Sequence, residues 1–229
     1  MPRVERVGLH PIGEHALFDE IGGARNMVAS SGSGRLQVLP LSIPDVKSIV
    51  APRYADARGF VSETFNRRDL AAAGIDFEGV QDNQSFSPRQ GTVRGLHFQL
   101  PPFAQAKLVR VSRGSIFDVA VDLRRGSPSY GRHASLELSA NGGVQMFIPV
   151  GFAHGFCTLE SDTEVLYKVD HYYSKPHEGG IRWNDPALAI GWPVSAAEAL
   201  VSDRDSELPL LKDFGSAFVF ENRTKAGAR

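Results

Sequence analysis

The chain has 229 residues, of which 42% are hydrophobic and 22% are charged, and its formal net charge is -1. This composition is typical of a soluble protein of enzyme size with one core domain. Nucleic acids and membrane surfaces are bound through a basic field, so a near-neutral chain makes both unexpected as partners. The single Cys157 excludes an internal disulfide, and no apolar run has the length of a signal peptide or a bilayer span. We therefore expect a cytoplasmic protein.

Composition divides the chain into three parts. Residues 29–34 read ASSGSG, a run of small residues with the composition of a flexible linker. We expect residues 1–35 to form a partly flexible N-terminal extension and residues 36–215 to form the folded domain. Residues 216–229 are expected to be a C-terminal tail.

The folded region has the pattern of an all-β protein. Its short apolar or alternating runs are separated by Gly, Pro, Asn and Asp, which favours an antiparallel sandwich or barrel. Short helices are expected only at 67–73, before Gly74, and at 196–201, after a cap at Ser195. The expected strands are 36–41, 47–54, 59–66, 92–99, 107–112, 115–123, 134–138, 144–149, 155–159 and 164–173.

Three ionisable residues lie in two neighbouring apolar strands. These residues are Arg94, His97 and Lys107. Burial of such groups costs several kcal/mol unless each finds a partner or a ligand, so we expect a polar cavity between the strands. Arg94 and His97 have opposite parity and would face opposite sides of a flat strand. A bulge at Gly95 would bring both to one side.

The strand expected at 115–123 carries acids at alternate positions. Asp118 and Asp122 share one face with the following Arg124, while the intervening positions are apolar. One interpretation is a solvated face of the sheet. The other places a carboxylate beside a histidine in a cavity between two sheets. The pattern alone favours neither.

Three further residues could contribute to a site. His154 follows a Pro and Gly turn, Tyr167 lies in mid-strand, and Asp185 lies in an Asn-Asp-Pro turn. A lone core His or Tyr is more often a packing residue, but several that converge on one cavity favour a site. A turn carboxylate can orient an imidazole and raise its basicity, although such a turn is often only a turn.

Seven sequence strings identify a family. They are RGLHFQ at 94–99, KLVR at 107–110, FDVAVD at 117–122, IPVGFAHGF at 148–156, LYK at 166–168, YYS at 172–174 and WND at 183–185. In this order they resemble the dTDP-4-dehydrorhamnose 3,5-epimerases, over roughly residues 41–211. The resemblance implies a cupin-like jelly roll with a few short peripheral helices, usually a homodimer, that uses neither a metal nor an organic cofactor.

The resemblance also implies a reaction and its catalytic residues. The reaction is epimerisation at C3 and C5 of dTDP-4-dehydro-6-deoxyglucose to dTDP-4-dehydro-L-rhamnose, through an enolate. By similarity His97 is the base, oriented by Asp185, and Tyr167 is the acid that returns a proton to the opposite face. Lys107 would stabilise the enolate oxygen. Reference pKa values of about 6.5 for imidazole and about 10 for phenol suit these two proton transfers near neutral pH.

Further residues match the family's groove for the nucleotide and the sugar. Arg58 and Arg94 would bind the pyrophosphate, and some of the matched residues would reach the site of a partner subunit. The expected substrate-binding residues are Tyr54, Arg58, Glu63, Gln81, Asn83, Arg94, His154, Tyr173 and Glu178.

Three alternatives stay open at this stage. A metal-dependent cupin is suggested by residues 149–154, which resemble a Pro-x-Gly-x-x-His half-site. The other half-site should offer His-x-His, but this chain has Gln99, a poor ligand for a transition metal. A non-catalytic sugar-nucleotide binding module and an epimerase acting at C3 or C5 alone are the other two alternatives.

Overall fold

The computed structural model describes residues 35–221. The linker-like run at 29–34 and almost all of the expected N-terminal extension therefore lie outside the described residues. No helix within 35–221 has the length and apolar character needed to cross a bilayer.

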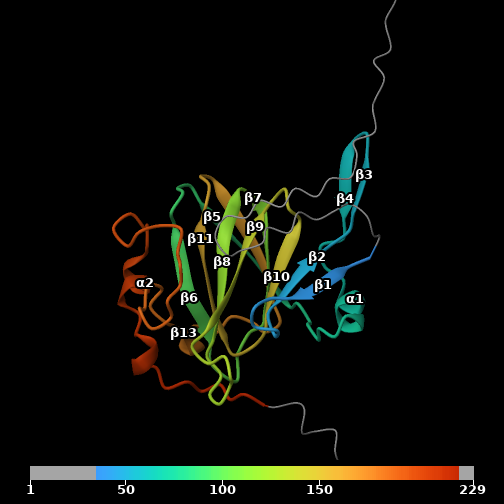
Figure 1. Cartoon of the computed structure of the whole chain (residues 1–229). Coiled ribbons are helices and arrows are strands. Elements are labelled where there is room, and N and C mark those ends of the chain that lie inside the picture. The colour runs from blue at the N-terminus through green and yellow to red at the C-terminus, as the bar shows by residue number, and fades with distance from the viewer. Residues whose placement is uncertain (1–34, 222–229) are drawn as a thin grey trace, which may run out of the picture.

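Two antiparallel sheets face each other in a β-sandwich (Figure 1). This arrangement of strands confirms the predicted all-β, cupin-like fold. A separate hairpin pairs β3 (Arg53–Asp56) with β4 (Gly59–Ser62). The six-stranded sheet has the order β1 (Gln37–Pro40), β2 (Lys47–Val50), β10 (Val144–Ile148), β7 (Lys107–Arg113), β12 (Thr163–Val169) and β5 (Gln81–Ser87). The five-stranded sheet has the order β13 (Glu178–Gly180), β6 (Val93–Gln99), β11 (Phe152–Thr158), β8 (Ser115–Asp122) and β9 (His133–Ser139).

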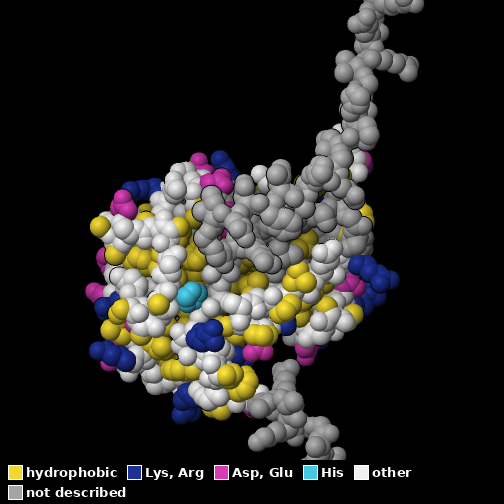
Figure 2. Space-filling model, viewed as in Figure 1, with side chains coloured by type: hydrophobic (Ala, Val, Ile, Leu, Met, Phe, Trp, Pro, Cys, Tyr) yellow, Lys and Arg dark blue, Asp and Glu magenta, His cyan; other side chains and the backbone are white. Residues whose placement is uncertain are grey.

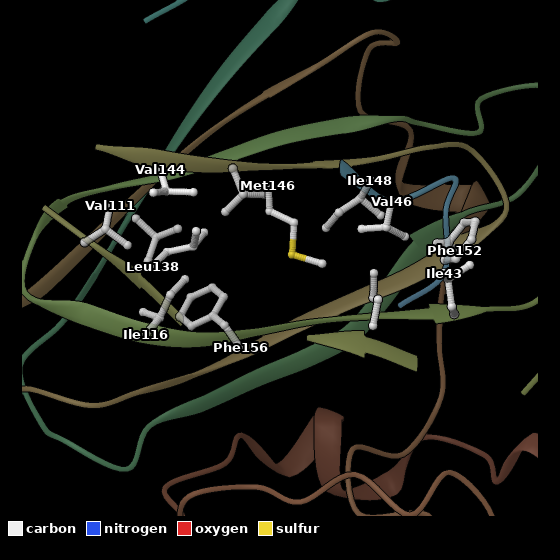
Figure 3. Close-up of a cluster of buried hydrophobic side chains, with 14 residues drawn as sticks. Ile43, Val46, Val111, Ile116, Leu138, Val144, Met146, Ile148, Phe152 and Phe156 are labelled. Carbon is white, nitrogen blue, oxygen red and sulfur yellow. The ribbon is translucent and has the colours of Figure 1, made fainter. Parts of the chain in front are cut away.

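The main hydrophobic core fills one part of the space between the two sheets (Figure 3). Met146, Ile116 and Leu138 are fully buried there. Complete burial of a side chain of this size contributes about 1.5–3 kcal/mol relative to exposure. This apolar packing holds the sheets together and leaves the remaining space between them for polar residues.

The outer faces of both sheets are also covered. Helix α1 (Arg67–Ala72) and the residues after it pack Leu70, Ile75 and Phe77 against the six-stranded sheet. The segment after β13 covers the five-stranded sheet, and Phe218 contacts Phe98 with ring centroids 5.7 Å apart. Residues 216–220, expected to belong to a tail, are thus packed against the body of the domain.

Most of the expected elements are confirmed, and the exceptions are one short helix and three elements that were not expected. Helix α1 is confirmed, with the Asn66 side chain as its N-cap. The prediction of a helix at 196–201 is wrong. A single turn forms there, and Leu200 then makes a β-bridge with Thr92, the residue before β6. Strands β5 and β13 and helix α2 (Asp203–Glu207), whose N-cap is Ser202, were not predicted from the sequence.

Candidate active site

A pocket of about 520 Å³ opens between the two sheets, beside the hydrophobic core. Strands β6 and β11 contribute to it from one sheet, and β5, β7 and β12 from the other. Residues 200–205 form the remaining wall. The lining residues are Ser85, Thr92, Val93, Arg94, His97, Lys107, His154, Phe156, Tyr167, Leu200, Val201, Ser202, Arg204 and Asp205.

A β-bulge in β6 brings Arg94 and His97 to the same side of the sheet. His97 pairs with His154 and Arg94 with Phe156, so two residues of β6 face the single Gly155 between them. Gly95 has a φ of +130°, and a Cβ there would lie 2.6 Å from the Gly155 Cα. The bulge expected at this glycine is therefore confirmed, and both side chains line the pocket.

His97 is paired with a carboxylate from helix α2. Its Nε2 lies 2.7 Å from Asp205 Oδ1, while Asp205 Oδ2 accepts a hydrogen bond from Gly95 N at 3.0 Å. Burial opposes the Asp205 charge, but the hydrogen bonds with His97 and Gly95 outweigh it and lower the pKa of the carboxyl. An ionised Asp205 that accepts a hydrogen from Nε2 leaves Nδ1 as the basic nitrogen of the neutral ring.

The structure corrects the prediction that Asp185 orients His97. The two Asp185 oxygens accept from backbone N–H groups of Ala187 and Leu211, at 2.9 and 2.6 Å. Asp185 lines a different, smaller cavity beside Trp183. Its role here is to fix a turn, because both oxygens are used by the backbone. Asp205, which was not predicted from the sequence, takes the place beside His97.

A second histidine–carboxylate pair contributes only its histidine, His154, to the lining of the pocket. His154 Nε2 is 2.6 Å from Asp118 Oδ1, and Asp118 is fully buried. This finding confirms the cavity interpretation of Asp118 and excludes the solvated face, because Asp122 is fully buried as well. Burial lowers the pKa of His154, with the Asp118 charge acting in the opposite direction. His154 is therefore kept neutral at physiological pH.

Lys107 lies beside both histidines. Its Nζ donates to the His97 carbonyl oxygen at 3.4 Å. Burial lowers the pKa of Lys107 to about 8, against the opposing charges of Asp118 and Glu178. The ammonium is thus desolvated but still largely protonated at neutral pH, the state required to stabilise a developing oxyanion.

Tyr167 extends into the pocket from the sheet that faces His97. Its ring centroid lies 6.0 Å from Lys107 Nζ. Burial raises the pKa of the phenol, while the charge of Arg94 opposes the shift. Tyr167 therefore remains protonated across the neutral range and can donate a proton. The three groups expected to act together, His97, Lys107 and Tyr167, all line this one pocket.

Arg94 connects the two sheets at the edge of the pocket. Its Nε donates to Ser87 Oγ at 3.1 Å, and one terminal nitrogen donates to the Phe86 carbonyl oxygen at 3.0 Å. These bonds fix the guanidinium over β5. The remaining N–H donors of the group are compatible with a bound anion.

Four other predicted residues form a hydrogen-bonded chain. Glu178 accepts from the Tyr173 hydroxyl at 3.0 Å and pairs with Arg204 at 2.8 Å. Gln81 donates to Asn83 at 2.8 Å and accepts from Tyr173 N at 2.9 Å. Burial opposes the Glu178 charge, but hydrogen bonds from Arg204 and Tyr173 lower its pKa. Arg204, which lines the pocket, was not anticipated from the sequence.

Three further predicted residues, on or next to the β3–β4 hairpin, also lie outside the lining of this pocket. Tyr54 and Glu63 line a cavity of about 530 Å³ next to α1. Arg58 pairs with Asp56 at 2.6 Å at the turn of the β3–β4 hairpin. The hairpin stands apart from the sandwich, on the side away from α2 (Figure 1). Figure 2 shows the whole molecule viewed as in Figure 1, with hydrophobic side chains exposed between charged ones.

Gln99 occupies the position where a metal-binding cupin would offer a second histidine. Its amide nitrogen donates to the carbonyl oxygens of Phe103 and Tyr172 at 2.7 and 3.2 Å, and its oxygen accepts from Ser174 N at 2.6 Å. Every polar atom of this amide is thus used to hold neighbouring loops. Residues 35–221 contain no group of three or more His, Cys, Asp or Glu side chains arranged to hold a metal ion.

The fold and the pocket define a cupin-like β-sandwich enzyme with acid, base and cation side chains in its interior. The family model for dTDP-4-dehydrorhamnose 3,5-epimerase matches residues 40–213. An epimerase of this name from Sinorhizobium fredii is 50% identical over 184 residues, which are 79% of this chain and 92% of that protein. The chain belongs to the dTDP-4-dehydrorhamnose 3,5-epimerase family.

Two solved structures extend the comparison. The dTDP-4-dehydrorhamnose 3,5-epimerase of Bacillus anthracis, solved with TDP and PPi bound, is 46% identical with a TM-score of 0.74, covering 76% of this chain and 99% of that one. The dTDP-6-deoxy-D-glucose-3,5-epimerase of Legionella pneumophila, in complex with dTDP-4-keto-L-rhamnose, is 37% identical with a TM-score of 0.77. It covers 82% of this chain and 100% of that one.

Proposed function

We propose that this chain epimerises C3 and C5 of dTDP-4-dehydro-6-deoxyglucose, giving dTDP-4-dehydro-L-rhamnose, and serves L-rhamnose biosynthesis as an isomerase of type EC 5.1.3.13. Family membership supports this assignment. The observation that carries it is the placement of His97 and Tyr167 on facing sheets, with the Lys107 ammonium in the same pocket. A base and an acid on opposite walls are what inversion of a carbon centre requires.

The first step removes a proton from the carbon next to the ketone. His97 Nδ1 accepts this proton, and the electron pair of the C–H bond moves to the C4 oxygen, forming an enolate. Asp205 stabilises the imidazolium, since its ionised carboxylate remains 2.7 Å from Nε2. Lys107 stabilises the enolate oxygen, an interaction for which about 3–4 kcal/mol is a typical contribution.

The second step returns a proton to the opposite face. The enolate electrons form a new C–H bond with the proton of the Tyr167 hydroxyl, and the ketone is restored. His97 then holds one extra proton and Tyr167 lacks one, so proton exchange with solvent resets both. Repetition at the second carbon completes the reaction. Because only protons move, neither an electron acceptor nor a cofactor is required.

The nucleotide half of the substrate would lie along the edge of the pocket. Arg94 would bind the pyrophosphate, and Gln81, Asn83, Tyr173 and Glu178 would contact the nucleoside, with His154 near the sugar. The hydrogen-bonded chain that joins these four residues supports a preformed surface. Such a surface reduces the entropy lost on binding.

We also propose a homodimer in which the β3–β4 hairpin completes the site of a second copy. Tyr54, Phe60 and Val61 on this hairpin are 58%, 56% and 71% exposed, a large apolar exposure for one short element. Arg58 at its turn would supply a cation to the neighbouring pyrophosphate, and Tyr54 and Glu63 would contact the nucleotide there.

Proton exchange in deuterated water tests the reaction. Incubation with dTDP-4-dehydro-6-deoxyglucose should place deuterium at both C3 and C5, detected by NMR. In the Tyr167→Phe variant we expect exchange to continue while formation of the rhamno product falls about 10²-fold, because the base remains and the acid is lost. Deuterium at only one carbon would indicate a mono-epimerase. No deuterium at either carbon would indicate a non-catalytic binding module.

Complementation between variants tests the shared site. His97→Ala and Arg58→Ala proteins should each have low activity, and each should sediment as a dimer. Mixing and subunit exchange should restore activity, because one of the two sites in a mixed dimer then contains both native residues. Sedimentation as a monomer, or failure of the mixture to recover activity, would refute the exchange of residues.

A further inference from the structure

Ser85 has a buried hydroxyl with no hydrogen-bond partner within residues 35–221. Three other side-chain atoms of that region share this property, on Ser48, Asp118 and His171. Ser85 differs from all three because it lines the pocket that contains His97 and Tyr167. A buried polar group without a partner is unfavourable, and such groups persist where a ligand satisfies them.

The strand register places Ser85 between two groups to which the proposed function assigns roles in the pocket. It lies opposite Val165 in β12, two residues from the position opposite Tyr167, so it is a diagonal neighbour of the phenol. In the other direction along β5, Ser87 accepts the hydrogen bond from Arg94 Nε. Alternate residues of a strand share a face, so Ser85 and Ser87 both face the interior.

We propose that the Ser85 hydroxyl is a substrate-binding group that donates to an oxygen of the nucleotide's diphosphate, beside Arg94. This inference rests on the sugar-nucleotide substrate proposed above. The Arg94 guanidinium is held over residues 86 and 87 by two hydrogen bonds, next to Ser85 in the strand. A phosphate oxygen bound to the free edge of that guanidinium would lie within reach of the hydroxyl.

The chemistry of a hydroxyl distinguishes this contact from the one made by Arg94. The guanidinium supplies charge and several N–H donors, whereas the hydroxyl supplies one rotatable donor from strand β5. Together they would fix the diphosphate from two directions. Such a pair would position the attached sugar between His97 and Tyr167 without taking part in proton transfer.

Calorimetric titration with dTDP provides a test that does not depend on turnover. The affinity of Ser85→Ala for dTDP should fall about tenfold to hundredfold, the range for a hydrogen bond to a charged group. Ser85→Cys should lose as much, because a thiol of similar size is a weak donor. The matched control is Ser48→Ala, which removes an equally buried, unpartnered hydroxyl from β2 and should leave the affinity unchanged.

Steady-state kinetics with the sugar nucleotide completes the test. For Ser85→Ala we expect KM to rise by the factor lost in dTDP affinity, while kcat stays within about threefold of the parent value. Unchanged dTDP affinity would overturn the proposal, and a rise in KM alone would indicate contact with the sugar instead. If the parent enzyme binds dTDP but produces no exchange, the proposed reaction fails and the Ser85 contact is still tested.

Discussion

Each of the two histidines that line the pocket pairs with a carboxylate, and the two pairs have nearly equal lengths in very different surroundings. His97 and Asp205 are 2.7 Å apart, and His154 and Asp118 are 2.6 Å apart. The His97 side chain is 31% exposed, whereas that of His154 is 7% exposed. Asp205 comes from a separate helix, while Asp118 comes from the strand next to His154.

The two pairs differ in burial and not in length, and this difference supports the roles that we propose for the two histidines. A general base must change its charge during the reaction, which is expensive for a group that has been removed from water. His97 is open to a ligand and to solvent. Burial lowers the pKa of His154, so that histidine is suited to donate or accept a hydrogen bond as a neutral ring.

The largest expected difference comes from replacing each histidine in turn. His97→Ala should reduce deuterium exchange at C3 and C5 by about 10²–10⁴-fold, the usual contribution of a general base. His154→Gln keeps a neutral polar side chain and should reduce exchange about tenfold. Exchange rates from NMR give both numbers. Equal losses in the two variants would contradict the assignment of roles, and sedimentation should confirm that both proteins remain folded.

The two carboxylates provide a second, smaller contrast. Asp205→Asn should slow the reaction about 10²-fold, because the amide cannot stabilise the imidazolium formed on His97. Asp118→Asn should slow it less, since His154 does not become charged. If Asp118→Asn lowers kcat more than Asp205→Asn does, without loss of stability, then His154 takes part in proton transfer.

The pH dependence of kcat/KM sharpens the comparison further. The pKa of Lys107 is about 8, so its ammonium loses its proton above that pH and the rate should fall several-fold by pH 9. Lys107→Arg should lack this alkaline limb, whatever its overall rate. Because the Asp118 charge raises the pKa of Lys107, Asp118→Asn should move the limb to lower pH. A limb that persists in Lys107→Arg would assign it to another group.

The smallest expected effect is on stability at mildly acidic pH. The folded protein holds the pKa of His154 below its unfolded value of about 6.5. The unfolded chain therefore binds more protons below pH 6.5, and stability should fall as the pH decreases from there. Urea unfolding between pH 5 and 8 should show this slope, and His154→Gln should reduce it. An unchanged slope would assign it to another group.

Local sequence patterns were sufficient to predict the parts of the site on β6 and β8, but not the part on β5. Alternation in β8 placed Asp118 with the pocket as one of two choices, and the glycine in β6 predicted the bulge that unites Arg94 and His97. These inferences succeeded because side-chain direction in a strand depends on neighbouring residues only. Strand β5 was missed because the side chains on its inward face are polar, whereas an amphipathic strand is recognised by apolar residues on that face. The inward residues are Gln81, Asn83, Ser85 and Ser87.

Asp205 could not be located by the same reasoning. Its contact with His97 joins residues 108 positions apart, and no periodicity relates α2 to β6. One local signal was present: Ser202 precedes Asp205 by three residues, the spacing of a helix cap, and its side chain accepts from Asp205 N. That signal predicts a helix start at this position. It does not predict what the Asp205 carboxylate contacts.

The distance along the chain between His97 and Asp205 has a consequence during protein synthesis. All the strands of both sheets precede residue 205, ending with β13 at Gly180. A nascent chain can therefore build the two sheets that enclose most of the pocket before α2 has left the ribosome, as domains begin to fold during translation. His97 lacks its carboxylate throughout that interval, so we expect catalytic competence to appear late, after the sandwich has already formed.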